Sequence, residues 1–155
     1  MSIISSFSPT AISRLSTDQI KNLASSDFKA MTTAQVNALT STQIAAMEDA
    51  DIQALSASQV GALNASSLAA DDAGIYSRVE LLAGAQIKAL STTQISNFNT
   101  NHIDYFSTAD MANFSAAQLN KFSTDVIAGF STDQIQALTT KQMRGLDSNF
   151  LGSLT

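Results

Sequence analysis

His102 is the only histidine in the sequence, and histidine is the side chain most often used for acid–base chemistry and for binding transition metals. Asp104 and Tyr105 follow it closely. A zinc site combines several His or Cys ligands, whereas this chain has no cysteine and no second histidine. A Ser-His-Asp set can be drawn in any chain so rich in serine, so it carries no information. We expect His102 to be a structural residue and predict no catalytic site, no resident metal and no cofactor.

Calcium is the alternative chemistry, because oxygen-bearing side chains gather before and within a short interruption of the sequence pattern. The residues concerned are Asn64, Ser66, Ser67, Asp71, Asp72 and Gly74. Clustered oxygen ligands in a loop can hold Ca²⁺, but the sequence contains no EF-hand or nonapeptide calcium motif. The acidic residues 48–51 are a weaker candidate. We expect a bulging loop in which Asp71 faces water, and calcium dependence stays open.

An eight-residue repeat runs through almost the whole chain, as in STDQIKNL (16–23) and SASQVGAL (56–63). Eighteen such units cover residues 8–154, interrupted only by three extra residues at 72–74. Position five of the unit is apolar in all eighteen units, and position eight is apolar in all except the unit that ends at Asp71. A fixed short period predicts a solenoid, in which each unit buries its apolar face against neighbouring units.

Each unit carries the start signal of a helix. Position one is Ser, Thr, Asn or Asp in fourteen units, and position four is Gln in nine, which is the capping-box pattern. The only proline, Pro9, follows the cap residue Ser8 at the first helical position, where a missing N–H is tolerated. We predict an all-α solenoid of about eighteen two-turn helices.

Two rival structures are excluded by the apolar spacing. In one continuous helix the apolar pair would drift by roughly 80° per unit, so no stable stripe would form. A β-solenoid requires alternation and many β-branched residues, whereas the apolar positions are spaced three and then five apart and the chain has only four valines.

The glutamines also predict how the helices wind. None of the nine falls in any third unit, where position four holds Asp27, Asp51, Arg78, His102, Val126 and Phe150. This spacing predicts three helices per 24-residue coil, arranged as the three corners of the coil. The helices at one corner would lack the position-four glutamine that helices at the other two corners carry.

Length and composition set further limits. The 155 residues predict one domain, 1–155, with the insertion at 72–74 between halves 1–71 and 75–155. The net charge of −5 and eight scattered basic residues argue against nucleic acid as a partner. No stretch approaches the eighteen apolar residues of a membrane span, and the N-terminus shows no Sec-type signal. The absence of cysteine is typical of bacterial secreted proteins and excludes disulfides and thiol chemistry.

The stretches LSTDQIKNL (15–23), LTSTQIAAM (39–47) and FSTDQIQALTTKQM (130–143) resemble the Leu-Thr-x-x-Gln-Ile-x-Ala-Leu octapeptide arrays of large bacterial secreted and surface proteins, some of them exported by type I systems. That resemblance covers nearly the whole chain. It implies a secreted or surface-displayed repeat array and no specific activity. LSTDQIKNLAS also resembles the opening helix of TAL-effector repeats, but the period of eight, the missing base-reading loop and the missing basic stripe exclude that family.

Two rows of side chains have both a structural and a functional interpretation. Position eight is Phe in five successive units: Phe98, Phe106, Phe114, Phe122 and Phe130. We expect these rings in the core, and the alternative is an exposed stripe for a partner. Position two is Thr in eight units (Thr17, Thr33, Thr92, Thr100, Thr108, Thr124, Thr132 and Thr140), which makes an ice-binding lattice a remote alternative.

The ends of the array carry the functional hypothesis. Solenoids usually finish with atypical repeats that have a polar outer face. Here the apolar pattern continues to both ends, and we predict an assembly interface made of Ile4, Phe7, Phe150, Leu151 and Leu154. Head-to-tail contact between copies that does not close gives an open filament. The hypothesis is therefore a non-enzymatic extracellular filament or surface layer of bacteria. A binding or adhesion spacer within a larger secreted protein, holding other surface proteins, is the alternative.

Overall fold

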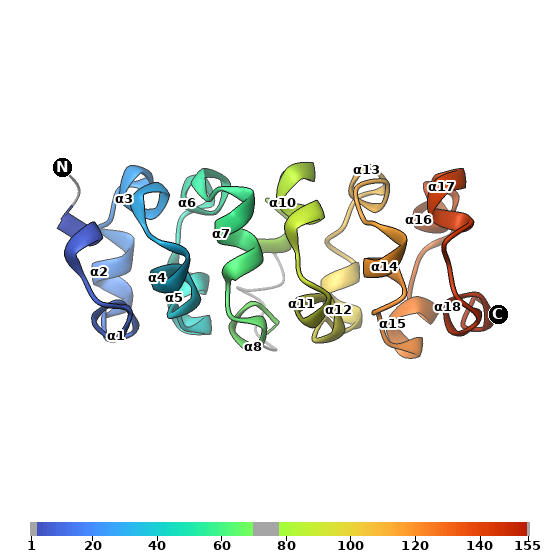
Figure 1. The fold of residues 1–155 in the computed structure, drawn as a ribbon, viewed down its shortest axis with the longest axis horizontal. Coiled ribbons are helices and arrows are strands. Elements are labelled where there is room, and N and C mark those ends of the chain that lie inside the picture. The colour runs from blue at the N-terminus through green and yellow to red at the C-terminus, as the bar shows by residue number, and fades with distance from the viewer. Residues whose placement is uncertain (1–2, 70–77, 155) are drawn as a thin grey trace.

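The computed structural model describes residues 3–69 and 78–154, and within these ranges every regular element is a helix. The chain forms an elongated array of short helices with its termini at opposite ends (Figure 1). The elements are η1 (Ile3–Ser6), α1 (Pro9–Ser13), α2 (Thr17–Lys21), α3 (Ser25–Ala30), α4 (Thr33–Asn37), α5 (Ser41–Ala46), α6 (Asp49–Ala54), α7 (Ala57–Ala62), α8 (Ala65–Leu68), α10 (Gly84–Ala89), α11 (Thr92–Ser96), α12 (Thr100–Ile103), α13 (Thr108–Met111), α14 (Ala116–Leu119), α15 (Thr124–Ala128), α16 (Thr132–Gln136), α17 (Thr140–Met143) and α18 (Ser148–Gly152).

The helices begin where the capping boxes predict. In α2 the Ser16 Oγ accepts a hydrogen bond from Gln19 N (3.2 Å), and Gln19 Oε1 accepts one from Ser16 N (2.9 Å). Pro9 is the first helical residue of α1, after the cap residue Ser8. The prediction that each repeat restarts a helix at position one is confirmed at these elements.

The helical segments are shorter than two full turns, because each one ends in a tight turn. The α-helices of the described residues contain four to six residues. Where α5 ends, Met47 N donates to Ile44 O (3.2 Å) and Met47 adopts an extended conformation, with φ −65° and ψ 147°. That extended residue leads directly into the next cap, so no helix grows beyond its own repeat.

Three helices make one coil, as the glutamine spacing predicts. The most extensive helix–helix contacts all join elements three places apart, from η1 with α3 and α1 with α4 to α14 with α17 and α15 with α18. The packing continues between α7 and α10, on either side of residues 70–77, which the structure does not describe. The insertion at 72–74 therefore lies outside the described residues, as does Asp71.

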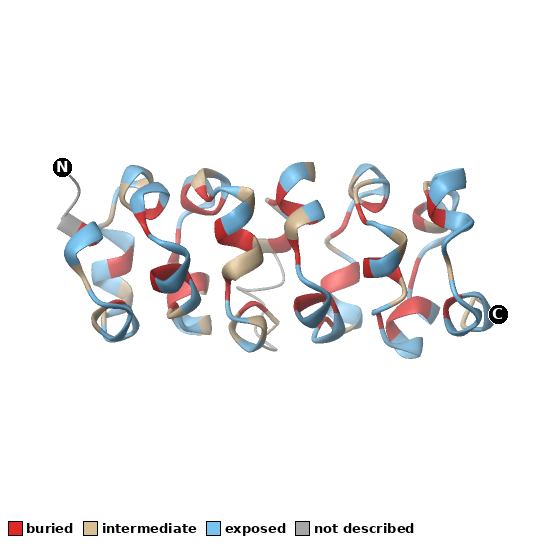
Figure 2. Cartoon of the chain, in the orientation of Figure 1, coloured by how far each residue is buried: buried red, intermediate tan, exposed pale blue. Residues whose placement is uncertain are grey.

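The core runs along the whole array, and every described helix except α17 contributes a buried or partly buried apolar side chain to it (Figure 2). Position five supplies residues such as Ile44, Ile87 and Ile103, each no more than 1 % exposed, and position eight supplies residues such as Leu39 and Phe114. Close approach of neighbouring helices is visible at Gly61, where an added Cβ would lie 2.5 Å from the backbone oxygen of Ala89. Isolated helices of this length are unstable in water, so contact with the neighbouring coils holds each of them.

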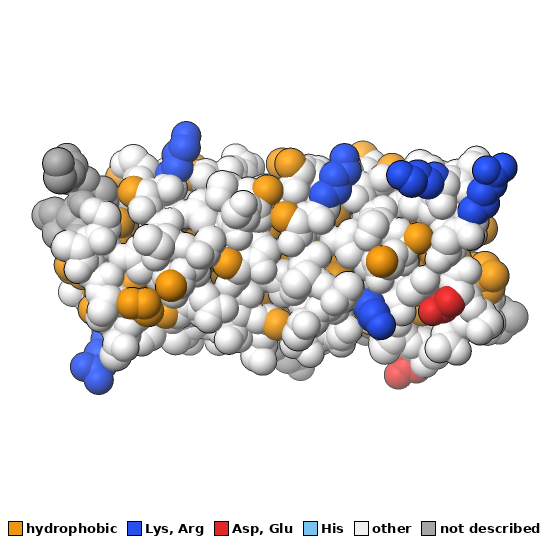
Figure 3. All heavy atoms as spheres, viewed as in Figure 1, with side chains coloured by type: hydrophobic (Ala, Val, Ile, Leu, Met, Phe, Trp, Pro, Cys, Tyr) orange, Lys and Arg blue, Asp and Glu red, His pale blue; other side chains and the backbone are white. Residues whose placement is uncertain are grey.

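The face shown in Figure 3 is mostly uncharged, with lysine and arginine side chains mainly toward its edges. Among the helices that the structure describes, none combines the length and apolar character needed to cross a membrane.

Candidate assembly surfaces at the ends of the solenoid

The glutamine at position four connects two coils as well as capping its own helix. In α5, Gln43 Oε1 accepts from Thr40 N (2.9 Å), which is the capping contact. Its Nε2 donates to the backbone oxygens of Ile12 and Leu15, both at 2.8 Å, at the end of α1. One side chain therefore satisfies a helix start and two carbonyl groups of the helix four places earlier.

The same connection recurs along the array. In each case the Nε2 atom reaches the position-five and position-eight carbonyls of the element four places before, and the glutamines that do this are Gln35, Gln43, Gln59, Gln86, Gln94, Gln118, Gln134 and Gln142. All eight are buried. Sequence reasoning assigned them to capping alone and missed these bonds. Buried carbonyls need donors, so the regular glutamine spacing was the signal that could have revealed them.

Position eight is only partly covered at the two ends of the array. In the first three elements this residue is Phe7, Leu15 and Leu23, and each is only partly buried. From Met31 to Leu138 it is buried in every described repeat, and in the last two repeats, at Leu146 and Leu154, it is again only partly buried. Position five of the same elements is buried throughout, with Ile12 and Ile20 fully covered.

Position five faces the C-terminal end. It is buried in every described helix up to α15, but in the last coil Ile135 is partly buried, Met143 is 41 % exposed and Leu151 is 47 % exposed. Met143 and Leu151 are the exposed large hydrophobic residues of the described chain. These three residues form what we call the terminal surface. These side chains are exposed because no further coil packs on the last one, whereas position five is buried wherever another coil follows.

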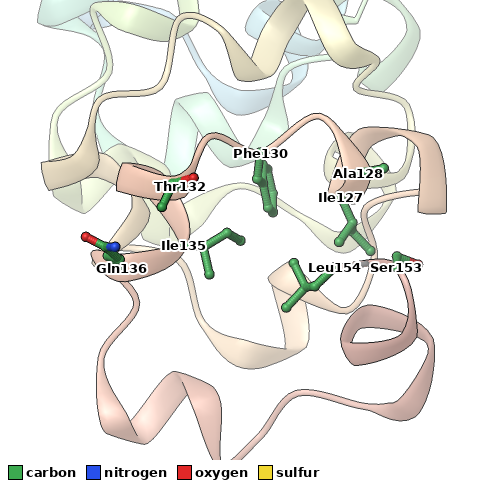
Figure 4. Close-up of a pocket in the computed structure, with 8 residues that line it drawn as sticks. All are labelled: Ile127, Ala128, Phe130, Thr132, Ile135, Gln136, Ser153 and Leu154. Carbon is green, nitrogen blue, oxygen red and sulfur yellow. The ribbon is translucent and has the colours of Figure 1, made fainter.

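A cavity of about 520 Å³ lies beside the terminal surface (Figure 4). Ile127, Phe130, Ile135 and Leu154 point toward one another across it, and Ala128, Thr132, Gln136 and Ser153 complete its lining. Ile127 and Phe130 occupy positions five and eight of α15, whose equivalents in earlier helices receive a glutamine from four helices later. The cavity thus lies where a further repeat would pack.

The predicted interface residues separate into two classes. Ile4 and Phe150 are buried within their own chain, at 3 % and 0 % exposure, so they support the end coils from inside. Phe7 and Leu154 are partly buried, and Leu151 is exposed. The structure brings Phe150, Leu151 and Leu154 together at the C-terminal end and places Ile4 and Phe7 at the opposite end (Figure 1).

His102 is fully buried at the start of α12, where its ring stacks on Phe98 with centroids 4.7 Å apart. Its Nδ1 atom accepts a hydrogen bond from Asn99 N (3.2 Å), so the imidazole takes the capping role that glutamine has in other helices. This is the structural role expected from the sequence.

The phenylalanines form a continuous stack inside the array. Successive rings from Phe98 to Phe130 have centroids 5.1 to 6.0 Å apart, and Phe150 continues the stack at 5.9 Å from Phe130. All six are buried. The interpretation of these residues as core is confirmed, and the alternative of an exposed stripe is wrong.

The remaining candidates offer little support for a ligand. Asp71, Asp72 and Gly74 lie outside the described residues. Asp51 uses its carboxylate to accept hydrogen bonds from Ser25 Oγ (2.7 Å) and from Glu48 N (2.9 Å). In residues 3–69 and 78–154, no three His, Asp or Glu side chains are grouped so that they could hold a metal ion.

The threonines at position two do not share one face. Three helices make each coil, so Thr33, Thr108 and Thr132 begin helices of one corner, Thr17, Thr92 and Thr140 those of a second, and Thr100 and Thr124 those of the third. A flat lattice that could match ice requires one plane, and this arrangement does not provide it.

A family model described as the ALTTAQ repeat matches residues 20–54 and 103–148, which together make up just over half of the chain. Within these ranges residues 30–35 read AMTTAQ and residues 137–142 read ALTTKQ. Each of these six-residue stretches therefore spans the end of one helix, the cap residue of the next helix and the glutamine that connects two coils. No curated protein and no solved structure is similar enough to the chain to count as a match.

Proposed function

The chain belongs to the ALTTAQ repeat family, and from that premise we propose that it is a non-enzymatic structural protein whose copies join head to tail into a filament or surface layer. Each added copy would place its first coil on the terminal surface of the copy before it. The contact between copies would then repeat the contact that already joins one coil to the next.

The observation that carries this proposal is the terminal surface itself. Met143 and Leu151 expose 41 % and 47 % of their surface, although the same repeat position is covered in the interior. Apolar area removed from water stabilises a contact by about 25 cal/mol per Å². A second copy that covers Ile135, Met143 and Leu151 gains this stabilisation with no change of fold.

The opposite end offers a surface of the complementary kind. Phe7, Leu15 and Leu23 lie at position eight of the first three elements, and each is only partly buried because no coil precedes them. Position five of one copy can therefore meet position eight of the next. Because the two surfaces differ, the contact is heterologous and leads to an open assembly.

An extracellular bacterial location is part of the proposal. Its support is the absence of cysteine, the low content of charged residues (14 %) and the resemblance to octapeptide arrays of secreted and surface proteins. Ser, Thr, Asn and Gln supply most of the polar surface instead of charged groups.

A binding or adhesion spacer is the second candidate, favoured by a cavity of about 340 Å³ on the side of the array. Lys88, Asn113, Phe114 and Lys141 are among the residues that line it. A protein partner held there would leave both ends of the solenoid free.

Sedimentation velocity and negative-stain microscopy of the 155-residue chain distinguish the two functions. We expect rods that lengthen with protein concentration and persist in added salt, because the contact is mainly apolar. The double variant Met143→Lys/Leu151→Lys changes two exposed residues and should remain a folded, helical monomer.

The matched control is Ala34→Lys/Ala109→Lys, which adds the same charge at exposed sites away from the terminal surface and should assemble like the wild type. A wild-type chain that stays monomeric at high concentration contradicts the filament and favours the spacer. Equal assembly of the two double variants contradicts the role of the terminal surface.

A further inference from the structure

We propose that the C-terminal end of the array recognises a second octapeptide array of different sequence, one whose first two repeats both carry glutamine at position four. The two glutamines would donate to the backbone oxygens of Ile127 and Phe130 in α15 and of Ile135 and Leu138 in α16. This inference rests on the assembly role proposed above for the terminal surface, and it names the chemistry of the partner that fits there.

The α15 oxygens lack donors that most helices at the same corner of the coil have. The spacing of three places η1, α3, α6, α12, α15 and α18 at this corner, where contacts join α3 to η1 and α6, and α15 to α12 and α18. The oxygens of η1, α3, α6 and α12 accept hydrogen bonds from the glutamines four elements later, namely Gln35, Gln59, Gln86 and Gln134. In the described part of the chain no hydrogen bond reaches the Phe130 oxygen, and the Ile127 oxygen accepts only from its own turn, from Gly129 N and Phe130 N.

The α16 oxygens are in the same situation at the next corner. There α1, α7, α10 and α13 receive Gln43, Gln94, Gln118 and Gln142. The helix α4 is the exception, because the repeat four places later carries Ser67 instead of glutamine. Within residues 3–69 and 78–154 no hydrogen bond reaches the Leu138 oxygen, and the Ile135 oxygen accepts only from Ala137 N and Leu138 N. Helices of the third corner, α17 among them, receive no glutamine anywhere in the chain, so α17 lacks no donor.

The place of the missing donors follows from the last two glutamines of the chain. Gln134 and Gln142 lie in consecutive repeats and bind the oxygens of α12 and α13. Two further repeats of the same kind, placed one coil beyond α16 and α17, would bind α15 and α16 in the same way. The cavity of about 520 Å³ lies at this place, with Ile127, Phe130 and Ile135 in its lining (Figure 4). An apolar side chain of the added repeats would fill it.

The first repeats of this chain do not meet that requirement. Position four holds Ala11 in α1, Gln19 in α2 and Asp27 in α3, so no two consecutive repeats both offer an amide donor. A second copy would therefore leave at least two of the four oxygens without a glutamine inside the contact. Because unpaired buried polar groups are costly, an array that begins with a glutamine pair is favoured over the chain's own first coil.

A synthetic peptide with the sequence of residues 131–146 (STDQIQALTTKQMRGL) tests this inference, because it contains two consecutive glutamine repeats. Its control is the Gln134→Glu/Gln142→Glu peptide, which keeps the capping acceptors and removes the donors. In fluorescence anisotropy with the full chain, we expect the control to bind at least about tenfold more weakly. A Gln134→Met/Gln142→Met peptide separates the lost donors from the added charge and should bind as weakly as the glutamate form.

Chain variants test where the peptide binds. Met143→Lys/Leu151→Lys changes the terminal surface and should weaken binding of the glutamine peptide at least about tenfold. Ala34→Lys/Ala109→Lys adds the same charge at exposed sites elsewhere and should bind the peptide like the wild type.

A tethered form provides a second measurement, because a free peptide loses conformational entropy when it becomes ordered on binding. The same sequence appended to the C-terminal end of the chain avoids part of the association cost. We expect the appended glutamine form to slow amide hydrogen exchange in α15 and α16 at least about tenfold relative to the appended glutamate form.

Equal binding of the glutamine and glutamate peptides overturns the inference while leaving end-to-end assembly intact, and so does equal exchange in the two tethered forms. If neither peptide binds, the tethered comparison decides. Preferred binding of the glutamine peptide to a wild type that never assembles with itself supports the inference and contradicts the filament.

Discussion

The interior coils and the last coil contain the same kinds of residues at the same repeat positions, yet their environments differ. Ile103 in α12 is 1 % exposed, and the oxygen of Ile103 accepts a hydrogen bond from Gln134 at 2.9 Å. Leu151 in α18 has the same repeat position and is 47 % exposed. The difference teaches that the burial of a position-five side chain in this fold depends on the neighbouring coil. In the last coil this side chain is exposed because no further coil covers it.

An aspartate at position five gives the largest expected contrast. Ile103→Asp places an unpaired charge in the core and should lower the free energy of unfolding by about 4 kcal/mol or more. Leu151→Asp puts the charge where water already reaches and should cost about 1 kcal/mol or less. Urea denaturation followed by circular dichroism measures both.

Because coupling is between neighbouring coils, limited proteolysis of Ile103→Asp should cut near α12 and leave the flanking coils partly protected. Equal destabilisation by the two aspartates contradicts the contrast between interior and end.

Loss of a connecting glutamine should have the next largest effect. Gln94→Leu removes the donor to the Val60 and Leu63 oxygens, both at 2.9 Å, and the acceptor for Ser91 N. Leaving these groups unpaired should cost about 3 kcal/mol. Gln19→Leu loses only the capping contact in the monomer and should cost about 1 kcal/mol.

Thermal unfolding of monomeric protein compares these two variants, and a double variant with Met143→Lys and Leu151→Lys provides a monomeric background. If Gln94→Leu and Gln19→Leu lowered the stability equally, glutamine would act as a cap alone.

Glycine positions give the smallest contrast. Gly61→Ala brings a Cβ to 2.5 Å from the Ala89 oxygen and should cost about 1–3 kcal/mol, because the neighbouring backbone must move. Gly152→Ala has nothing within 4 Å of the added Cβ and should stabilise α18 by up to about 1 kcal/mol. Denaturation midpoints show whether each substitution raises or lowers the stability. A stabilising Gly61→Ala would contradict the close packing of α7 on α10.

Much of the fold was predictable from local signals. Ser16 with Gln19 predicted a capping box, Pro9 predicted a helix start, and the absence of glutamine at residues such as Asp27 and Asp51 predicted three helices per coil. These features depend on a few neighbouring residues or on a simple count, so the sequence contains them directly.

The direction of the side chains could not be predicted in the same way. Whether position five faces the preceding or the following coil depends on the hand of the winding, which a repeat pattern does not encode. The second bonds of Gln43 depend on the pitch that brings α1 within reach. For the same reason the pattern placed Ile4 and Phe150 in the end interface without revealing that their own chain buries them.

The central claim is that a second copy completes the last coil, and cryo-electron microscopy of assembled wild-type protein tests it most directly. The account predicts rods in which the coil spacing continues across each junction without a gap, with η1 of one copy following α18 of the copy before. Copies joined side by side, or particles no longer than one chain, would contradict it.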